Sequence, residues 1–237
     1  MNLAFKHFSQ DENKTWTALF NRQMPLRDQQ IHPIFSRGVN ALGLTEKGIP
    51  SLDVVNTRLK NLTGFTGVPV SGLEEPEHVF KLLSEKHFPI GNFIREPKDL
   101  SYTPAPDVFH DMYGHIPYFA DKDYAVFCEN YGKKALELRH LPDALIQFDR
   151  LFWFTIEFAL IKTPKGNRIF GAGITSSFME CEYALSDKPD VQPFNLDIIR
   201  HQDFRIDELQ KRLFILENEA QLYSCLGEFE KLVRSGL

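Results

Sequence analysis

Apolar residues recur at helical spacing along much of the chain. From Ser51 onwards they return every three or four positions, which predicts a helix that begins here and is capped by the Ser51 side chain. The same spacing, weakest in the first stretch, predicts further helices over residues 14–24, 77–86, 107–114, 121–138, 143–162 and 177–186. Because strands and helices do not alternate regularly, the pattern does not favour a parallel sheet covered by helices.

Extended and irregular segments are fewer. Residues 88–95 (FPIGNFIR) predict a short strand, and residues 165–175, which contain several Gly, predict a hairpin. Residues 63–73 are dense in Gly and Pro, so we expect an irregular segment there, and residues 97–106 predict a loop. The last part, from about residue 203 to 233, predicts a strand or turn followed by an amphipathic helix.

The composition is typical of a globular protein with one domain over residues 1–237. Hydrophobic residues make up 43% of the chain and charged residues 25%, so there is enough apolar material to bury a core without disulfides or a structural metal. The formal net charge of −5 argues against nucleic acid as a partner, because the phosphate backbone attracts basic proteins.

The first residues and the cysteines bear on the compartment. The start, MNLAFKHFSQDENK, lacks the basic and apolar regions of a signal peptide, and no apolar run reaches the roughly 18–20 residues that a membrane span needs. The three Cys are scattered and odd in number, which indicates a reducing compartment. These observations predict a soluble, cytoplasmic protein without a membrane partner.

The segment PAPDVFHDMYGHIPYF contains the most informative polar residues. His110 and His115 are five positions apart, which on a continuous α-helix separates them by about 140° and is a poor geometry for one metal. Gly114 and Pro117 favour a helix end near Gly114, which would swing His115 back towards His110. A metal site and a pair of hydrogen-bonded His at a helix end fit this pattern about equally well.

A single carboxylate lies in the aromatic segment LFWFTIEFALI. Glu157 is the only charged residue among these eleven, and an unpaired carboxylate in an apolar helix costs several kcal/mol or stays protonated. Its partner is either a metal or an Arg elsewhere, unless the helix is less buried than its sequence suggests. Two His and one carboxylate form the facial triad of non-haem iron(II) oxygenases, and this favours the metal.

Two further features are ordinary by themselves. The small residues of GAGITSSF let the backbone approach a ligand, and Ser176 and Ser177 would either bind that ligand or cap the following helix. Arg95 precedes the loop over residues 97–106 and would matter if this loop folds over the metal. A lone Arg is otherwise a surface residue, here paired with Glu96 or Asp99.

Three segments resemble, in order and spacing, the pterin-dependent aromatic amino acid hydroxylases: PDVFHDMYGHIPYF, FWFTIEF and GAGITSSFME. Within that family the chain looks like the small bacterial phenylalanine 4-hydroxylases, over about residues 50–225. The resemblance implies an α+β fold, a predominantly helical basket with little sheet. It also implies that a free aromatic amino acid, above all phenylalanine, is hydroxylated by O₂ and a tetrahydropterin at an Fe(II) centre.

The resemblance implies a role for each matching residue. The catalytic iron would be bound by His110, His115 and Glu157. Arg95 would bind the carboxylate of the amino acid, and Glu180 would brace this Arg. The backbone of the substrate would be held by Tyr102, Thr103 and Ser176. The walls of the aromatic pocket would be Pro106, Trp153, Phe158 and Gly173. The pterin would lie against Gly72, Leu73, Asp111 and Phe152.

The chain departs from the family pattern around the pterin. Val79 stands where the family has a Phe that stacks on the pterin, and Phe80 follows it. Phe152 stands where a Tyr is common, and Asp111 replaces the longer Glu of animal members, as it does in bacterial ones. The stacking residue is therefore either displaced to Phe80 or replaced by Val79.

Substrate preference and assembly are inferred from the same resemblance. Trp153 fits phenylalanine and tyrosine hydroxylases, whereas Ile206 aligns with a position that is Ile in tryptophan hydroxylases. We therefore expect phenylalanine as the best substrate and tryptophan next. The chain has neither the N-terminal regulatory domain nor the C-terminal tetramerisation arm of animal relatives, so we expect a monomer.

Two functions of other classes use the same three metal ligands. One is a zinc-dependent hydrolase with Asp111 or Glu180 as the base. The other is a non-catalytic binding protein whose fold the metal stabilises, for which the metal site should be closed. The aromatic surroundings of Glu157 fit an open site better than a closed one.

Overall fold

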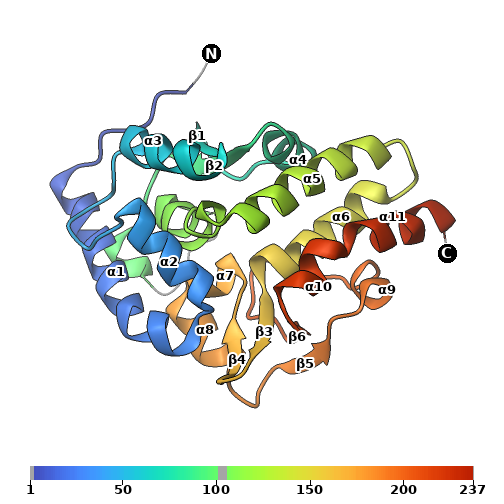
Figure 1. The fold of residues 1–237 in the computed structure, drawn as a ribbon. Helices are drawn as coiled ribbons and strands as arrows, with labels where there is room; N and C mark the ends of the chain where they lie inside the picture. Colours follow the sequence, from blue (N-terminus) through green and yellow to red (C-terminus); the bar gives the residue numbers. More distant parts are fainter. Residues whose placement is uncertain (1–2, 101–105, 237) are drawn as a thin grey trace.

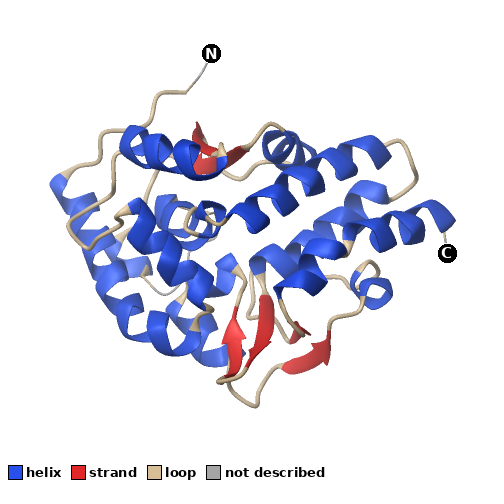
Figure 2. Cartoon of the chain, in the orientation of Figure 1, coloured by secondary structure: helices blue, strands red, loops and turns tan. Residues whose placement is uncertain are grey.

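The computed structural model describes residues 3–100 and 106–236, in which helices predominate and two small sheets lie at opposite edges of the view (Figures 1 and 2). The elements of the first half are α1 (Gln10–Gln30), α2 (Pro33–Leu42), α3 (Leu52–Thr63), β1 (Thr66–Val70), α4 (Pro76–Ser84), β2 (His87–Gly91) and a 3₁₀ turn, η1 (Pro97–Asp99). Those of the middle are the π-helical turn η2 (His110–His115), the 3₁₀ turn η3 (Tyr118–Ala120), α5 (Lys122–Leu138), α6 (Ala144–Phe152) and the π-helical turn η4 (Trp153–Glu157).

The last part of the chain alternates strands with short helices. Its elements are β3 (Ala159–Thr163), β4 (Gly166–Ile169), α7 (Ala172–Thr175), α8 (Phe178–Ala184), β5 (Asp190–Pro193), α9 (Leu196–Ile199), β6 (Arg212–Leu216), α10 (Glu219–Ser224) and α11 (Leu226–Ser235). The expected α+β fold, mostly helical with little sheet, is confirmed. Within the described residues, no helix is both long and apolar enough to cross a membrane.

The larger sheet fixes the end of the segment that carries Glu157. Its strand order is β4-β3-β6-β5, with β3 antiparallel to β4 and parallel to β6. The first three residues of β3 are buried, and the strand begins two residues after Glu157. In Figure 2 this sheet lies at the lower edge of the view, opposite the parallel pair β1–β2. Glu157 is therefore held at the point where a helical segment meets a sheet.

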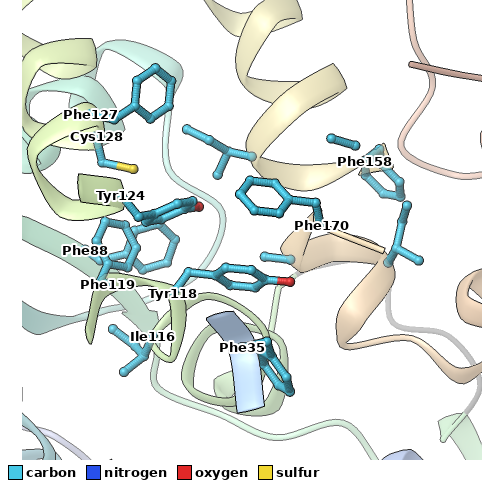
Figure 3. Close-up of a cluster of buried hydrophobic side chains, with 14 of the residues drawn as sticks. Phe35, Phe88, Ile116, Tyr118, Phe119, Tyr124, Phe127, Cys128, Phe158 and Phe170 are labelled. Atoms are coloured by element: carbon cyan, nitrogen blue, oxygen red, sulfur yellow. The ribbon is translucent and has the colours of Figure 1, made fainter. Parts of the chain in front are cut away.

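An aromatic cluster fills the interior next to the expected metal ligands. Figure 3 shows Phe88, Tyr118, Phe119, Tyr124 and Phe170 together, contributed by β2, η3, α5 and the residue that follows β4. All five are fully buried or nearly so, and neighbouring ring centroids lie 5.1–6.2 Å apart in tilted or edge-to-face arrangements. Each such pair contributes about 0.5–1.5 kcal/mol beyond its burial. The cluster gives the site a rigid floor.

Most predicted helices are confirmed, but their ends differ. The helix after Ser51 forms as α3, although the Ser51 side chain makes no capping hydrogen bond. The weak pattern over 14–24 belongs to the longer α1, whose start is fixed by a capping box between Ser9 and Glu12. Sequence reasoning missed α2, which begins at Pro33 directly after α1. The segment 97–106 begins with η1, and its last part includes residues 101–105, which lie outside the described residues.

Two predictions about strands are wrong in part. Residues 63–73, expected to be irregular, contain β1, which tolerates Pro69 because a strand in a two-stranded sheet has a free edge. The helix predicted over 143–162 ends at Glu157, and its last residues form β3, because a short apolar run fits a buried strand as well as a helix. The predicted hairpin over 165–175 therefore begins earlier, with β3 as its first strand and β4 as its second.

The close packing of α2 on the turn after His115 makes a testable prediction. A Cβ at Gly38 would overlap the carbonyl oxygen of Pro117, whereas a Cβ at Gly227 would meet nothing within 4 Å. We expect Gly38→Ala to lower the free energy of unfolding by about 1–3 kcal/mol, because the backbone contact must open. Gly227→Ala, in α11, should raise it by roughly 0.5–1 kcal/mol. Urea denaturation of both variants checks this, and equal stabilities would contradict it.

Candidate functional site

Two turns of π-helix form the centre of the site. The first, η2, spans His110–His115, and the N–H of Ile116 donates to the carbonyl of Asp111 five residues earlier (3.1 Å). Because a π-turn links residues five apart, His110 and His115 come to lie on the same side of the helix. Their Nε2 atoms are 3.1 Å apart.

The turn ends at His115, close to the predicted end near Gly114, and the two His converge as expected, but a π-turn rather than a break at Gly114 brings them together. The helical turn continues through Gly114 to His115. Gly114 is required for a different reason, because a Cβ here would lie 2.8 Å from the carbonyl oxygen of Ala172 and 2.9 Å from the Cβ of Ser176. The missing side chain lets α7 pack directly on η2.

The second π-turn, η4, places the carboxylate. The N–H of Phe158 donates to the carbonyl of Trp153 (2.9 Å), again across five residues. Glu157 Oε1 lies 3.0 Å from Nε2 of His115, and its Oε2 lies 3.8 Å from Nε2 of His110. The ligand atoms of the three side chains all lie within 4.8 Å of one another. The structure thus brings together the three residues that the sequence proposed.

A serine fixes the orientation of one imidazole. The hydroxyl of Ser176 donates to the carbonyl of Gly173 (3.2 Å), so its oxygen is left to accept a hydrogen bond from Nδ1–H of His110 (3.0 Å). With its proton on Nδ1, His110 presents the lone pair of Nε2 to His115 and Glu157. Second contacts of this kind commonly orient a metal-binding His.

The protonation states also suit a metal. Burial lowers the pKa of His110 to about 4, so this imidazole is neutral near pH 7. Burial alone would raise the pKa of Glu157, but the neighbouring His115 and His110 and the N–H of Gly173 bring it below its usual range. A neutral imidazole and an ionised carboxylate are the forms that bind a metal.

The donor set fits iron(II). The lone pair of His110 Nε2 faces the carboxylate of Glu157, and two such acceptors repel each other unless a cation lies between them. Two imidazoles and one carboxylate on one side of an ion are typical of non-haem iron(II) sites with open positions. Phe88 stacks on His115, with 4.5 Å between ring centroids, and keeps this ligand in place from the side of the core.

Arg95 is buried and paired, which excludes a surface Arg bound to Glu96 or Asp99. Only 7% of Arg95 is exposed. Its Nε and Nη2 donate to the two carboxylate oxygens of Asp107 (2.8 and 2.9 Å), and its backbone N–H donates to Asp107 as well (2.9 Å). Asp107 also accepts the backbone N–H of His110 (2.9 Å). One buried carboxylate therefore joins Arg95 to the start of the helix that carries His110.

Sequence reasoning missed Asp107 and gave its role to Glu180. The interpretation that Glu180 braces Arg95 is wrong, since Asp107 holds the guanidinium and no ion pair joins Arg95 to Glu180 within the described residues. The signal for Asp107 was present: Asp is a preferred N-cap, and its partner His110 lies three residues later. Burial alone would raise the pKa of Asp107, but the side-chain hydrogen bonds and the charge of Arg95 bring it below its usual range.

A cavity of about 410 Å³ opens beside the three expected ligands. The expected site residues that line it are Leu73, Arg95, Pro106, His110, Trp153, Glu157, Phe158, Gly173, Ser176 and Glu180. The lining residues that were not assigned to the site beforehand are Ser177, Met179, Ile206, Asp207, Glu208, Leu209 and Gln210. Ser177 had been considered as either a ligand-binding or a capping residue, and it caps α8 by accepting the N–H of Glu180. Ile206 had been considered only for substrate preference. Tyr102 and Thr103, expected to hold the substrate, lie outside the described residues.

The residues expected to contact the pterin differ in exposure. Leu73 is 68% exposed at the mouth of the cavity, and Gly72 and Phe152 are half-buried. Asp111 is buried, and its carboxylate accepts the N–H of Gly91 (2.6 Å) at the end of β2. Burial raises the pKa of Asp111 well above its usual range.

Phe80 cannot replace the missing stacking residue. It is 1% exposed and packs in the core against Tyr131, Phe148 and Phe152, with ring centroids 5.8–6.4 Å apart. Val79 is half-buried on the same helix, α4. Of the two positions considered, only Val79 is left to reach a ligand.

The buried carboxyl of Glu180 predicts a pH-dependent stability. Its Oε2 has no hydrogen-bond partner in the described part of the chain, and burial raises its pKa to about 7 from 4.5. The unfolded chain therefore ionises near pH 4.5 while the folded chain keeps the proton until about pH 7. The stability that the protonated form contributes is lost as the pH rises through this window.

We expect Glu180→Gln to remove this loss. Relative to the variant, the original protein should lose about 1–3 kcal/mol of unfolding free energy between pH 5 and pH 8. Urea denaturation at the two pH values measures it. Glu182→Gln, at an exposed position of the same helix, is the control and should show no such change. A constant difference between the original protein and Glu180→Gln would contradict the prediction.

Comparison with known proteins agrees with this geometry. The phenylalanine-4-hydroxylase of Caulobacter vibrioides is 39% identical over 219 residues, which cover 91% of this chain and 73% of that protein. The phenylalanine-4-hydroxylase of Pseudomonas aeruginosa is 36% identical over 95% of this chain and 85% of its own length.

Solved structures show the same arrangement of elements. Phenylalanine hydroxylase from Legionella pneumophila superposes with a TM-score of 0.90 at 38% identity and covers 97% of this chain and 92% of its own. The Chromobacterium violaceum enzyme with bound iron(III) and 7,8-dihydrobiopterin gives 0.93 at 34% identity, over 99% of this chain and 86% of its own. Residues 2–235 match the sequence model of the biopterin-dependent aromatic amino acid hydroxylase family. The chain belongs to the biopterin-dependent aromatic amino acid hydroxylases.

Proposed function

We propose that this protein hydroxylates the ring of free phenylalanine to give tyrosine, with O₂ and a tetrahydropterin, at an iron(II) centre. The observation that carries the proposal is the convergence of His110, His115 and Glu157 beside a cavity with aromatic walls and a buried Arg. Such a set of ligands leaves positions open for O₂. The names of the two bacterial relatives support phenylalanine as the substrate.

The residues of the chain would hold the reactants and keep the site dry. Iron(II) and a tetrahydropterin, when bound, supply the chemistry that reduces O₂ and delivers one of its oxygen atoms to the ring. His110, His115 and Glu157 would hold the metal, with Ser176 keeping His110 in the required tautomer. The aromatic walls would exclude water, which would otherwise consume the oxidant.

Arg95 would bind the carboxylate of the amino acid. Among the described residues, Asp107 occupies the Nε–Nη2 edge of the guanidinium, which leaves the Nη1–Nη2 edge for a second carboxylate. Two parallel charge-assisted hydrogen bonds would then fix the substrate. Because Asp107 also accepts the backbone N–H of His110, the anchor for the substrate and the helix with the metal ligands keep a fixed separation.

The aromatic ring of the substrate would lie between the pocket walls. Trp153 and Phe158 contact each other with 4.6 Å between ring centroids, and both line the cavity with Pro106. Gly173 leaves the space open, because a Cβ there would lie 2.8 Å from Oε2 of Glu157. Such walls place the ring close to the metal ligands, and correct placement of this kind accelerates a reaction strongly.

The family resemblance extends the proposal to the pterin site and the domain organisation. We propose that the pterin lies against Gly72, Leu73, Asp111 and Phe152, and that residues 1–237 act as one catalytic domain. We also propose that Tyr102 and Thr103 hold the backbone of the substrate, as the family resemblance implies. A cytoplasmic location is supported by three Cys that are free and buried.

One observation favours a second substrate. Ile206, which matches the tryptophan hydroxylases, lines the cavity and is 55% exposed. Tryptophan is therefore the alternative substrate, within the same chemistry. Family membership disfavours the zinc hydrolase and the non-catalytic binding protein, because neither uses a pterin.

The proposal is tested by reconstitution. The protein is loaded with Fe(II) without air, then given O₂, a tetrahydropterin and one aromatic amino acid at a time, and the products are identified. We expect tyrosine from phenylalanine in proportion to the pterin consumed. Hydrolysis with bound zinc and no pterin-dependent O₂ uptake would favour the hydrolase instead.

The metal ligands predict the effect of one substitution. His115→Ala should abolish iron binding and hydroxylation, because the two remaining donors, His110 and Glu157, do not complete the site. His7→Ala, at an exposed position, should keep both and serves as the control. Iron content and circular dichroism of each variant are measured together. A folded His115→Ala variant with stoichiometric iron and full activity would show that the ligand assignment is wrong.

The anchor for the substrate predicts another. Arg95→Lys keeps the charge but loses the planar fork, so the KM for phenylalanine should rise about 10–100-fold while the iron content stays the same. Pterin oxidation should also become uncoupled from hydroxylation, because a loosely held ring misses the oxidant. Arg37→Lys, at a side chain that is 63% exposed, is the control. An unchanged KM would remove Arg95 from the substrate site.

We also propose that the protein is a monomer. The net charge of −5 opposes self-association weakly. Light scattering should therefore give a mass near 27.4 kDa. A stable tetramer would contradict this.

A further inference from the structure

One wall of the cavity comes from a segment without regular secondary structure. Residues 204–210, here called the wall segment, lie between α9 and β6, and five of them line the cavity from Ile206 to Gln210. At its start, Phe204 stacks on Trp153 with 4.3 Å between ring centroids and 11° between ring planes. At its end, Gln210 is hydrogen-bonded to the same indole.

The amide of Gln210 is fully used inside the protein. Its Oε1 accepts the Nε1–H of Trp153 (2.9 Å), and its Nε2 donates to the carbonyls of Arg205 (2.7 Å) and Glu208 (3.0 Å). Because an indole only donates and carbonyls only accept, this orientation of the amide is the one that satisfies all three contacts. The side chain is 5% exposed, so water does not compete for these groups.

These contacts leave Trp153 little freedom. The stacking on Phe204 sets the plane of the indole, while the hydrogen bond to Gln210 selects which edge faces the wall segment. A flat ring held by stacking alone can still slide or turn over within its slot. A directional hydrogen bond to a buried, fully satisfied amide removes that freedom.

We propose that Gln210 is a positioning residue for substrate selection, which acts through Trp153 by fixing the indole that walls the pocket for the aromatic ring. The inference deepens the proposed function and rests on it. Gln210 also fixes the position of the wall segment, which contains Ile206, relative to Trp153. Trp153 matches the phenylalanine hydroxylases and Ile206 matches the tryptophan hydroxylases. Gln210 thereby fixes the positions of these two residues relative to each other.

The kinetic test is a double-mutant cycle on the iron-loaded protein. In Gln210→Leu, the ratio of kcat/KM for phenylalanine to that for tryptophan should fall on the order of 3–10-fold. The reason is that a Trp153 indole no longer held by Gln210 can move and admit the larger ring of tryptophan. In a Trp153→Phe background the same substitution should change the ratio no further, because no indole N–H is left to hold. Gln29→Leu, at an exposed position of α1, is the control and should leave the ratio unchanged.

A spectroscopic test does not depend on activity. The chain has two Trp, and the spectrum of Trp153 is obtained by subtracting that of the Trp153→Phe variant. In Gln210→Leu the fluorescence of Trp153 should shift, and acrylamide should quench it more readily. Gln210→Glu keeps an acceptor for the indole, so its spectrum should stay closer to the original one. If Gln210→Leu does not fold, Gln210→Met, which also lacks the amide acceptor, replaces it.

The outcomes separate the two proposals. If no aromatic amino acid is hydroxylated, the proposed function fails, and the fluorescence still decides whether Gln210 holds Trp153. If the protein is active, equal selectivity in Gln210→Leu and the original protein would overturn the inference. Full additivity of Gln210→Leu and Trp153→Phe would overturn it as well, since Gln210 would then act independently of Trp153.

Discussion

Two π-helical turns packed against an aromatic core are the constraint on which the rest of this site depends. Each turn is closed by a hydrogen bond across five residues, from Ile116 to Asp111 and from Phe158 to Trp153. The residues that close them, Ile116 and Phe158, lie in the buried cluster of Figure 3. Since π-turns are rare and unfavourable in isolation, the packing behind them must hold them. The ligand side chains converge because the core fixes the backbone on which they stand.

Burial shapes the chemistry of the same residues. Burial keeps His110 neutral, whereas His115 and the N–H of Gly173 lower the pKa of Glu157 although burial opposes this. Asp107 remains charged in the interior only because it accepts four hydrogen bonds from Arg95 and the backbone of His110. A buried ion pair of this kind contributes little net stability but places its partners accurately. The cavity therefore has a neutral imidazole, that of His110, and a fixed guanidinium, that of Arg95, on elements that Asp107 joins.

The cavity is assembled from segments that are distant in the chain. One side is formed by η2 and η4, which carry the candidate metal ligands. A second side is formed by α7 and α8, and a third by the wall segment. The stacking of Phe204 and the hydrogen bond of Gln210 join that wall to Trp153. Close packing of this kind couples the wall segment to the aromatic pocket. A substitution in the wall segment is therefore expected to change the shape of the pocket. The proposed role of Gln210 in substrate selection depends on these contacts between η4 and the wall segment.

The sequence by itself determined the ligand types, the family and most helices. Glu157 stands out because its charge conflicts with its apolar neighbours, and His110 and His115 stand out by their spacing around Gly114. Arg95 was assigned to the site through the family resemblance. Tertiary structure decided what local spacing does not encode. The π-turns replaced the expected break at Gly114, β3 replaced the end of a helix, and Asp107 took the place given to Glu180. Gln210 and Trp153 are 57 residues apart, so only the folded chain brings them into contact.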